Sequence, residues 1–126
     1  MEVDMTQHES KPVILAVDDE PDIIRVLAGI LKDNYMIIVA TDGRKALEQA
    51  VAENQPDLIL LDIMMPDMDG YEICRRLKAD PMTRDIPIIF ITRRNEEDDE
   101  AKGLDLARVT GSGPNIHEGV TTLIAE

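Results

Sequence analysis

The sequence has few cysteine, histidine and aromatic residues, and each shortage excludes a class of protein. The single cysteine, Cys74, excludes a disulfide framework and fits a reducing compartment, so we expect a cytoplasmic location. Two histidines cannot build a histidine-rich metal site, and two tyrosines with one phenylalanine give no stacking platform for bases. No apolar run approaches the roughly 20 residues of a membrane helix, which predicts no membrane contact.

Positively charged residues are half as frequent as negatively charged ones. Thirteen lysine and arginine residues face 26 aspartate and glutamate residues, so the formal net charge is -13. A chain with this balance lacks the basic face that phosphate contacts require, which predicts no direct binding to nucleic acid. Carboxylates that crowd together need a nearby cation or a proton, so the positions of the acidic residues become informative.

Apolar runs and amphipathic segments alternate along a chain whose 126 residues fit one domain. Buried strands are predicted at residues 13–17, 36–40, 58–61 and 86–91, with a poorer fifth strand at 107–111. Helices are predicted at residues 21–33, 42–51, 69–79 and, weakly, 95–103, with a short last helix from residue 116. The predicted fold class is α/β: a five-stranded parallel sheet, doubly wound in the order 2-1-3-4-5, with helices on both faces.

Acidic and hydroxyl side chains stand at the ends of three predicted strands. Asp18 and Asp19 follow the first strand, Asp62 follows the third, and Thr92 follows the fourth. These strands are neighbours in the predicted order, so their carboxyl ends should bring the four residues together. Converging carboxylates repel each other, and Mg²⁺ relieves that repulsion while still binding phosphate oxygens. Each acidic residue alone could equally be a helix cap, so the metal site rests on the three strand ends together.

Three segments resemble the receiver domain of bacterial two-component response regulators. They are Val17-Asp-Asp-Glu-Pro21, Leu60-Leu-Asp-Ile-Met-Met-Pro-Asp-Met-Asp-Gly70 and Phe90-Ile-Thr92. The resemblance covers about residues 11–106 and implies a domain that accepts a phosphoryl group from a sensor histidine kinase or a phosphotransfer protein. We therefore expect a flexible segment at residues 1–10 and a receiver domain at 11–126 that is atypical over 106–126.

The resemblance also implies a role for individual residues. Asp62 would be the phosphoacceptor, and it would ligate Mg²⁺ together with Asp19 and the main-chain carbonyl of Met64. Asp18 would hold a metal-bound water, and Thr92 would hydrogen-bond the phosphoryl group and move with it. Such a domain is not an enzyme in the usual sense, because it modifies its own aspartate and so regulates a downstream protein or an output domain.

The sequence departs from the family pattern near its C-terminal end. The family's lysine, which pairs with the phosphoryl group and precedes a proline, is replaced by Gly113. The family's aromatic switch residue, two positions earlier, is replaced by Gly111. Arg93 stands where a small residue usually follows the threonine, and it either contacts the phosphoryl group in place of the lysine or points to solvent. On this reasoning Gly113→Lys is predicted to raise phosphoryl uptake.

Two alternatives to a phosphorylation-controlled module remain open. A degenerate receiver would act as a phosphorylation-independent protein-interaction module. A metal-dependent phosphohydrolase would use Asp62 as its nucleophile, but Met64 stands where a second acid or base would be expected. Phosphoryl uptake from a small donor separates the first alternative from a switching receiver, and turnover of a phosphate ester would favour the second.

Overall fold

A computed structural model describes residues 11–93 and 104–110, and for residues 92, 93 and 104–110 it describes the backbone. In chain order its elements are β1 (Val13–Val17), α2 (Pro21–Leu31), β2 (Met36–Ala40), α3 (Gly43–Ala50), β3 (Leu58–Asp62), α4 (Gly70–Ala79), β4 (Ile88–Arg93) and β5 (Leu104–Thr110). The first four predicted strands and the first three predicted helices are confirmed, with boundaries that differ by two residues or fewer. The predicted segment 1–10, the helix at 95–103 and the helix from residue 116 lie outside the described residues.

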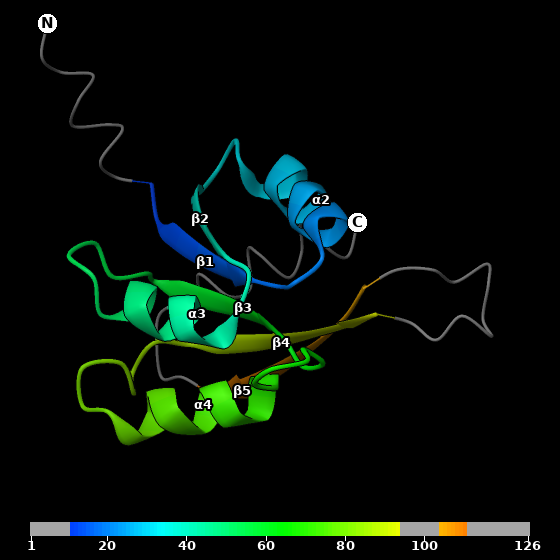
Figure 1. Cartoon of the computed structure of the whole chain (residues 1–126). Coiled ribbons are helices and arrows are strands. Elements are labelled where there is room, and N and C mark those ends of the chain that lie inside the picture. The colour runs from blue at the N-terminus through cyan, green and yellow to red at the C-terminus, as the bar shows by residue number, and fades with distance from the viewer. Residues whose placement is uncertain (1–10, 94–103, 111–126) are drawn as a thin grey trace, which may run out of the picture.

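The strands form one sheet in the order β2-β1-β3-β4-β5, which confirms the predicted order. The strands β1 to β4 run parallel to one another. Figure 1 shows α2 on one side of the sheet and α3 and α4 on the other. In this doubly wound arrangement, the loops that leave the carboxyl ends of β1 and β3 share one edge of the sheet, where ligands bind in folds of this class.

Side chains alternate between the two faces of the sheet and build one hydrophobic core on each face. The core beside α3 and α4 consists of Leu15, Val17, Ala40, Ala46, Ala50, Ile59, Leu61, Met65, Ile73, Leu77, Ile88 and Phe90. The core beside α2 consists of Ile14, Ala16, Leu27, Leu31, Leu58, Leu60, Ile89 and Ile91. Every residue of β3 is buried, because both faces of this central strand are covered, and its sequence is therefore continuously apolar until Asp62.

The helices begin at the residues that the sequence indicates. Pro21 opens α2, where its missing N–H removes no helical hydrogen bond. The side chain of Asp42 caps α3 by accepting from Lys45 N at 2.8 Å, and Asp69 caps α4 by accepting from Glu72 N at 2.9 Å. None of the helices in the described ranges is long and apolar enough to cross a lipid bilayer.

The prediction of a wholly parallel sheet is wrong at β5, which runs antiparallel to β4 and spans Leu104–Thr110. Parallel neighbours need a crossover of a dozen or more residues, usually a helix, whereas antiparallel neighbours need only a hairpin connection. Ten residues, 94–103, connect β4 to β5, and five of them in succession are acidic. This connection is shorter than a parallel crossover requires, so its length favours the antiparallel pairing.

Candidate functional site

Asp18 and Asp62 lie side by side at the carboxyl ends of β1 and β3. Val17 pairs in register with Leu61, so the next residue along each strand lies at the same level of the sheet. Both aspartates are buried, with 2% and 4% of their surface exposed. Asp19 follows directly, and one carboxylate oxygen from each of the three residues lies within 4.8 Å of the others. The structure therefore brings together the three acidic residues that the strand ends indicated.

Backbone N–H groups hold two of these carboxylates in place. Glu20 N donates to Asp18 Oδ1 at 2.9 Å, and Met64 N donates to Asp62 Oδ1 at 3.3 Å. Asp18 N in turn donates to the carbonyl of Ala40 at 3.1 Å, which anchors the first turn after β1 to the end of β2. Hydrogen bonds from backbone donors favour the charged form of a carboxylate and fix its orientation.

The surroundings of the Asp19 carboxylate indicate whether a cation fits the cluster. Its Oδ1 atom is buried and has no hydrogen-bond partner within the described part of the chain. A buried carboxylate oxygen without a donor is costly, and the cost rises when two further carboxylates stand beside it. A hard divalent cation with oxygen ligands removes both costs, so the three residues together could hold a metal ion.

The backbone positions of Thr92 and Arg93 lie at the same edge of the sheet. Asp62 pairs in register with Ile91, so Thr92 is the next residue along β4 beyond the level of Asp62. The structure places Thr92 within β4 rather than after it, and Arg93 is the last residue of that strand. Met64 follows two residues after Asp62, in the loop to α4, and its side chain is 72% exposed.

Gly70 packs against the site, although its sequence position predicted no role for it. A Cβ atom at this position would lie 2.4 Å from the carbonyl oxygen of Asp62, so only glycine permits this close approach. The N–H of Gly70 donates to the carbonyl of Ile63 at 2.8 Å. The one signal in the sequence is a glycine directly after the capping residue Asp69, at the start of a helix where glycine has no advantage over other residues.

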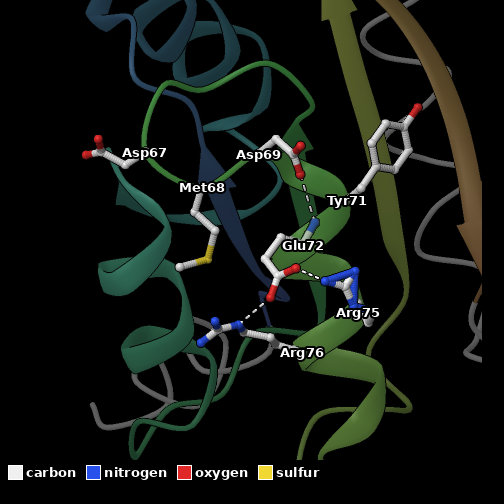
Figure 2. A pocket seen from close by; sticks show the side chains of 7 residues that line it. All are labelled: Asp67, Met68, Asp69, Tyr71, Glu72, Arg75 and Arg76. Carbon is white, nitrogen blue, oxygen red and sulfur yellow. Dashed lines mark hydrogen bonds and ion pairs between the residues drawn. The ribbon is translucent and has the colours of Figure 1, made fainter.

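A polar hollow of about 490 Å³ lies beside the first turns of α4, and its lining includes none of the three clustered aspartates. Its lining consists of Asp67, Met68, Asp69, Tyr71, Glu72, Arg75 and Arg76, all drawn in Figure 2. Figure 2 shows the carboxylate of Glu72 directed at Arg75 and Arg76, and Arg76 Nε lies 2.7 Å from Glu72 Oε2. Both guanidinium groups are thus paired with Glu72, which lowers the attraction of the hollow for an anion.

A sequence model of the family described as "Response regulator receiver domain" matches residues 14–109. The matched span contains Asp18, Asp19, Asp62 and Thr92. The chain belongs to the response regulator receiver domain family, whose members act in two-component signalling. This membership, together with the sheet order, confirms the predicted family and, apart from the direction of β5, the predicted fold class.

Individual relatives agree with this assignment. Response regulator PleD of Caulobacter vibrioides is 46% identical over 93 residues, which cover 73% of this chain and 20% of PleD. The alkaline phosphatase synthesis transcriptional regulatory protein PhoP of Bacillus subtilis is 42% identical over 94 residues, which cover 74% of this chain and 38% of PhoP. The crystal structure of the N-terminal domain of a response regulator receiver protein from Methanoculleus marisnigri JR1 matches with a TM-score of 0.63 and 45% identity, covering 72% of this chain and 76% of that one.

The matched region makes up 20% of PleD and 38% of PhoP, so this chain spans well under half the length of either relative. PhoP is named as a transcriptional regulatory protein, and a name of that kind describes the whole relative. The absence of direct nucleic-acid binding by this chain therefore stays a prediction from its charge.

Proposed function

We propose that this chain is a phosphoacceptor signalling domain that takes a phosphoryl group onto Asp62 with the help of Mg²⁺. The observation that carries the proposal is the convergence of Asp18, Asp19 and Asp62, with ligand oxygens within 4.8 Å of one another. Membership of the receiver family supports the same function. The proposed donor is a sensor histidine kinase or a phosphotransfer protein in the cytoplasm, and the proposed result is regulation of a downstream protein or an output domain.

The proposed metal site has Asp19, Asp62 and the main-chain carbonyl of Met64 as direct ligands, and Asp18 holds a metal-bound water. All four supply oxygen atoms, which suit Mg²⁺, and the buried Oδ1 of Asp19 gains a partner. Mg²⁺ bound there would neutralise the negative charge of the carboxylates, which otherwise repels an anionic phosphoryl donor.

Asp62 is the proposed nucleophile. One of its carboxylate oxygens forms the new O–P bond while the P–N bond of a phosphohistidine donor breaks, and the imidazole leaves with the bonding electron pair. Met64 N, 3.3 Å from Oδ1, holds the carboxylate in position for this displacement. Thr92 and Arg93 are the proposed contacts of the transferred group, because a hydroxyl and a guanidinium both donate hydrogen bonds to phosphoryl oxygens.

The test is covalent labelling of the whole chain by a small acyl phosphate in the presence of Mg²⁺, followed by intact mass measurement. We expect the natural chain to gain the mass of one phosphoryl group and Asp62→Asn to gain none. The matched control is Asp67→Asn, which removes an exposed aspartate five positions on in the same loop and should label like the natural chain. Equal labelling of Asp62→Asn would place the acceptor elsewhere.

A second candidate function is a phosphorylation-independent interaction module on a receiver scaffold. The observation that favours it is the antiparallel β5, because the family's lysine follows a fifth strand that this chain pairs in the opposite direction. For this candidate we expect no labelling of the natural chain with Mg²⁺ and equal binding of a partner by the natural chain and Asp62→Asn.

A further inference from the structure

The first residues of β5 lie at the same end of the sheet as the aspartate cluster, which is the end where β1, β3 and β4 have their carboxyl termini. This placement follows from the antiparallel direction of β5, which pairs Thr92 with Asp105 and Arg93 with Leu104. Figure 1 shows β4 and β5 side by side along their length. Because Asp62 pairs with Ile91, Asp105 lies opposite the residue of β4 that comes directly after the level of Asp62.

We propose that Asp105 is a fourth acidic residue of this site, whose charge strengthens the attraction for a divalent cation and slows the arrival of a phosphoryl group. The second half of this statement rests on the proposed function, whereas the first half concerns the cation alone. The observation behind both is the register of β5, which places a carboxylate residue beside Thr92. In a parallel fifth strand, this edge would instead carry the residues that follow the strand, among which the family has its lysine.

The backbone spacing makes a charge effect of Asp105 measurable. Neighbouring strands lie about 4.8 Å apart, so β5 is about 10 Å from β3 across two such spacings. The Debye length is about 30 Å at 0.01 M ionic strength but about 3 Å at 1 M. The charge of Asp105 should therefore reach the aspartate cluster at low ionic strength and be screened from it at high ionic strength.

The sign of the effect differs for the two ligands. A divalent cation is attracted by an additional carboxylate, whereas a phosphoryl group that carries about -1.5 to -2 charges is repelled. Removing the charge of Asp105 should therefore weaken Mg²⁺ binding and, at saturating Mg²⁺, speed phosphoryl uptake. If Asp105 merely supported the fold of β5, its substitution would lower both the Mg²⁺ affinity and the rate of phosphoryl uptake.

The experiment compares Mg²⁺ binding by four forms of the whole chain at low ionic strength. The forms are the natural chain, Asp105→Asn, Asp105→Glu, which keeps the charge, and Asp33→Asn as the matched control. Asp33 is an exposed aspartate in the loop after α2, at the opposite edge of the sheet. Circular dichroism checks that each variant is folded, and Asp105→Ser removes the same charge if asparagine disturbs the strand.

We expect Asp105→Asn to raise the Mg²⁺ dissociation constant about two- to fivefold, the range of an ion pair exposed to water, and the difference to vanish at high salt. Asp105→Glu and Asp33→Asn should bind like the natural chain. Equal Mg²⁺ affinity of Asp105→Asn and Asp33→Asn would overturn the proposal, and so would a difference that persists at 1 M salt. Labelling by an acyl phosphate tests the two ideas separately: if no variant labels while the Mg²⁺ shift is present, the phosphoacceptor function fails and the place of Asp105 beside the cation site stands.

Discussion

Gly70 packs against the backbone of Asp62 so closely that a Cβ atom on Gly70 would lie 2.4 Å from the Asp62 carbonyl oxygen. The same Cβ would lie 2.9 Å from the α-carbon of Ile63. These atoms are backbone and cannot rotate away, so the start of α4 and the end of β3 form one packed unit. The position of the proposed phosphoacceptor therefore depends on a residue eight positions further along the chain.

The first prediction is that Gly70→Ala destabilises the fold. The added methyl group forces the backbone at Asp62 to shift, and overpacking of this kind costs about 1–3 kcal/mol of unfolding free energy. Urea denaturation followed by circular dichroism measures the change. The matched control is Gly29→Ala, because a Cβ there has no atom within 4 Å, and the gain in helix propensity should stabilise α2 by about 0.5–1 kcal/mol. Equal effects of the two substitutions would contradict the close approach at Gly70.

The second prediction concerns Mg²⁺ and the stability of the fold. Mg²⁺ that binds only the folded chain should raise the unfolding free energy by about 1.4 kcal/mol at ten times its dissociation constant. Asp62→Asn should stay folded in the absence of metal, since one of three crowded carboxylates is neutralised, and should show a smaller rise with Mg²⁺. Thermal melting at constant ionic strength measures both. An unchanged melting temperature across millimolar Mg²⁺, in both forms, would show that the cluster is not a metal site.

Much of the architecture could be predicted because it depends on local patterns in the sequence. β3 is apolar at every position before Asp62, since both of its faces are buried, and that pattern predicts a strand of a parallel sheet covered on both faces. Asp42 and Asp69 are capping residues with acceptors three positions before the N–H groups they bind. The convergence of Asp18 and Asp62 then follows from strand order alone.

The features that could not be predicted depend on contacts between distant segments. The direction of β5 depends on its pairing with β4, and the weak helical pattern in the sequence of residues 94–103 could not predict that pairing. The role of Gly70 depends on the path of β3, which no residue near Gly70 reveals. The roles of Thr92 and Arg93 come from the family resemblance. The structure places both residues in β4, and their contact with a phosphoryl group stays a prediction.

The third prediction concerns the pH at which Cys74 reacts. Cys74 packs against the core beside α4, and burial raises the pKa of its thiol, although the nearby ammonium of Lys78 lowers it by a smaller amount. Because of the raised pKa, the thiol reaches half ionisation at a higher pH in the folded chain than in the unfolded chain. Alkylation should therefore be slower in the folded chain, and its pH profile should lie at higher pH than in urea.

Lys78→Gln provides the control for this interpretation of Cys74. The glutamine amide can still donate to the carbonyl groups of Arg84 and Ile86, which Lys78 Nζ contacts at 2.8 and 2.9 Å. Loss of the ammonium should move the alkylation profile of the folded chain to still higher pH. An unchanged profile, or a shift to lower pH, would contradict the lowering of the thiol pKa by the charge of Lys78.

The last prediction asks where a restored cation would act. The family's lysine corresponds by sequence to Gly113, which lies outside the described residues, but β5 ends at Thr110, paired with Ile88 at the amino end of β4. Asp62 lies at the other end of the sheet, level with Ile91, and Asp105 lies close to that level. We therefore expect Asp105→Lys to increase the rate of phosphoryl uptake more than Gly113→Lys does.

The size of the effect follows from the contact that the ammonium would make. A hydrogen bond from an ammonium to the phosphoryl group contributes about 1.5–3 kcal/mol, which corresponds to a rate increase of about tenfold or more when formed in the transition state. Intact mass measurement over time with an acyl phosphate and Mg²⁺ gives the rates. A larger increase for Gly113→Lys would show that β5 pairs in the parallel direction when the chain accepts phosphate. Efficient labelling of the natural chain that Arg93→Ala abolishes would instead identify Arg93 as the cation that replaces the family's lysine.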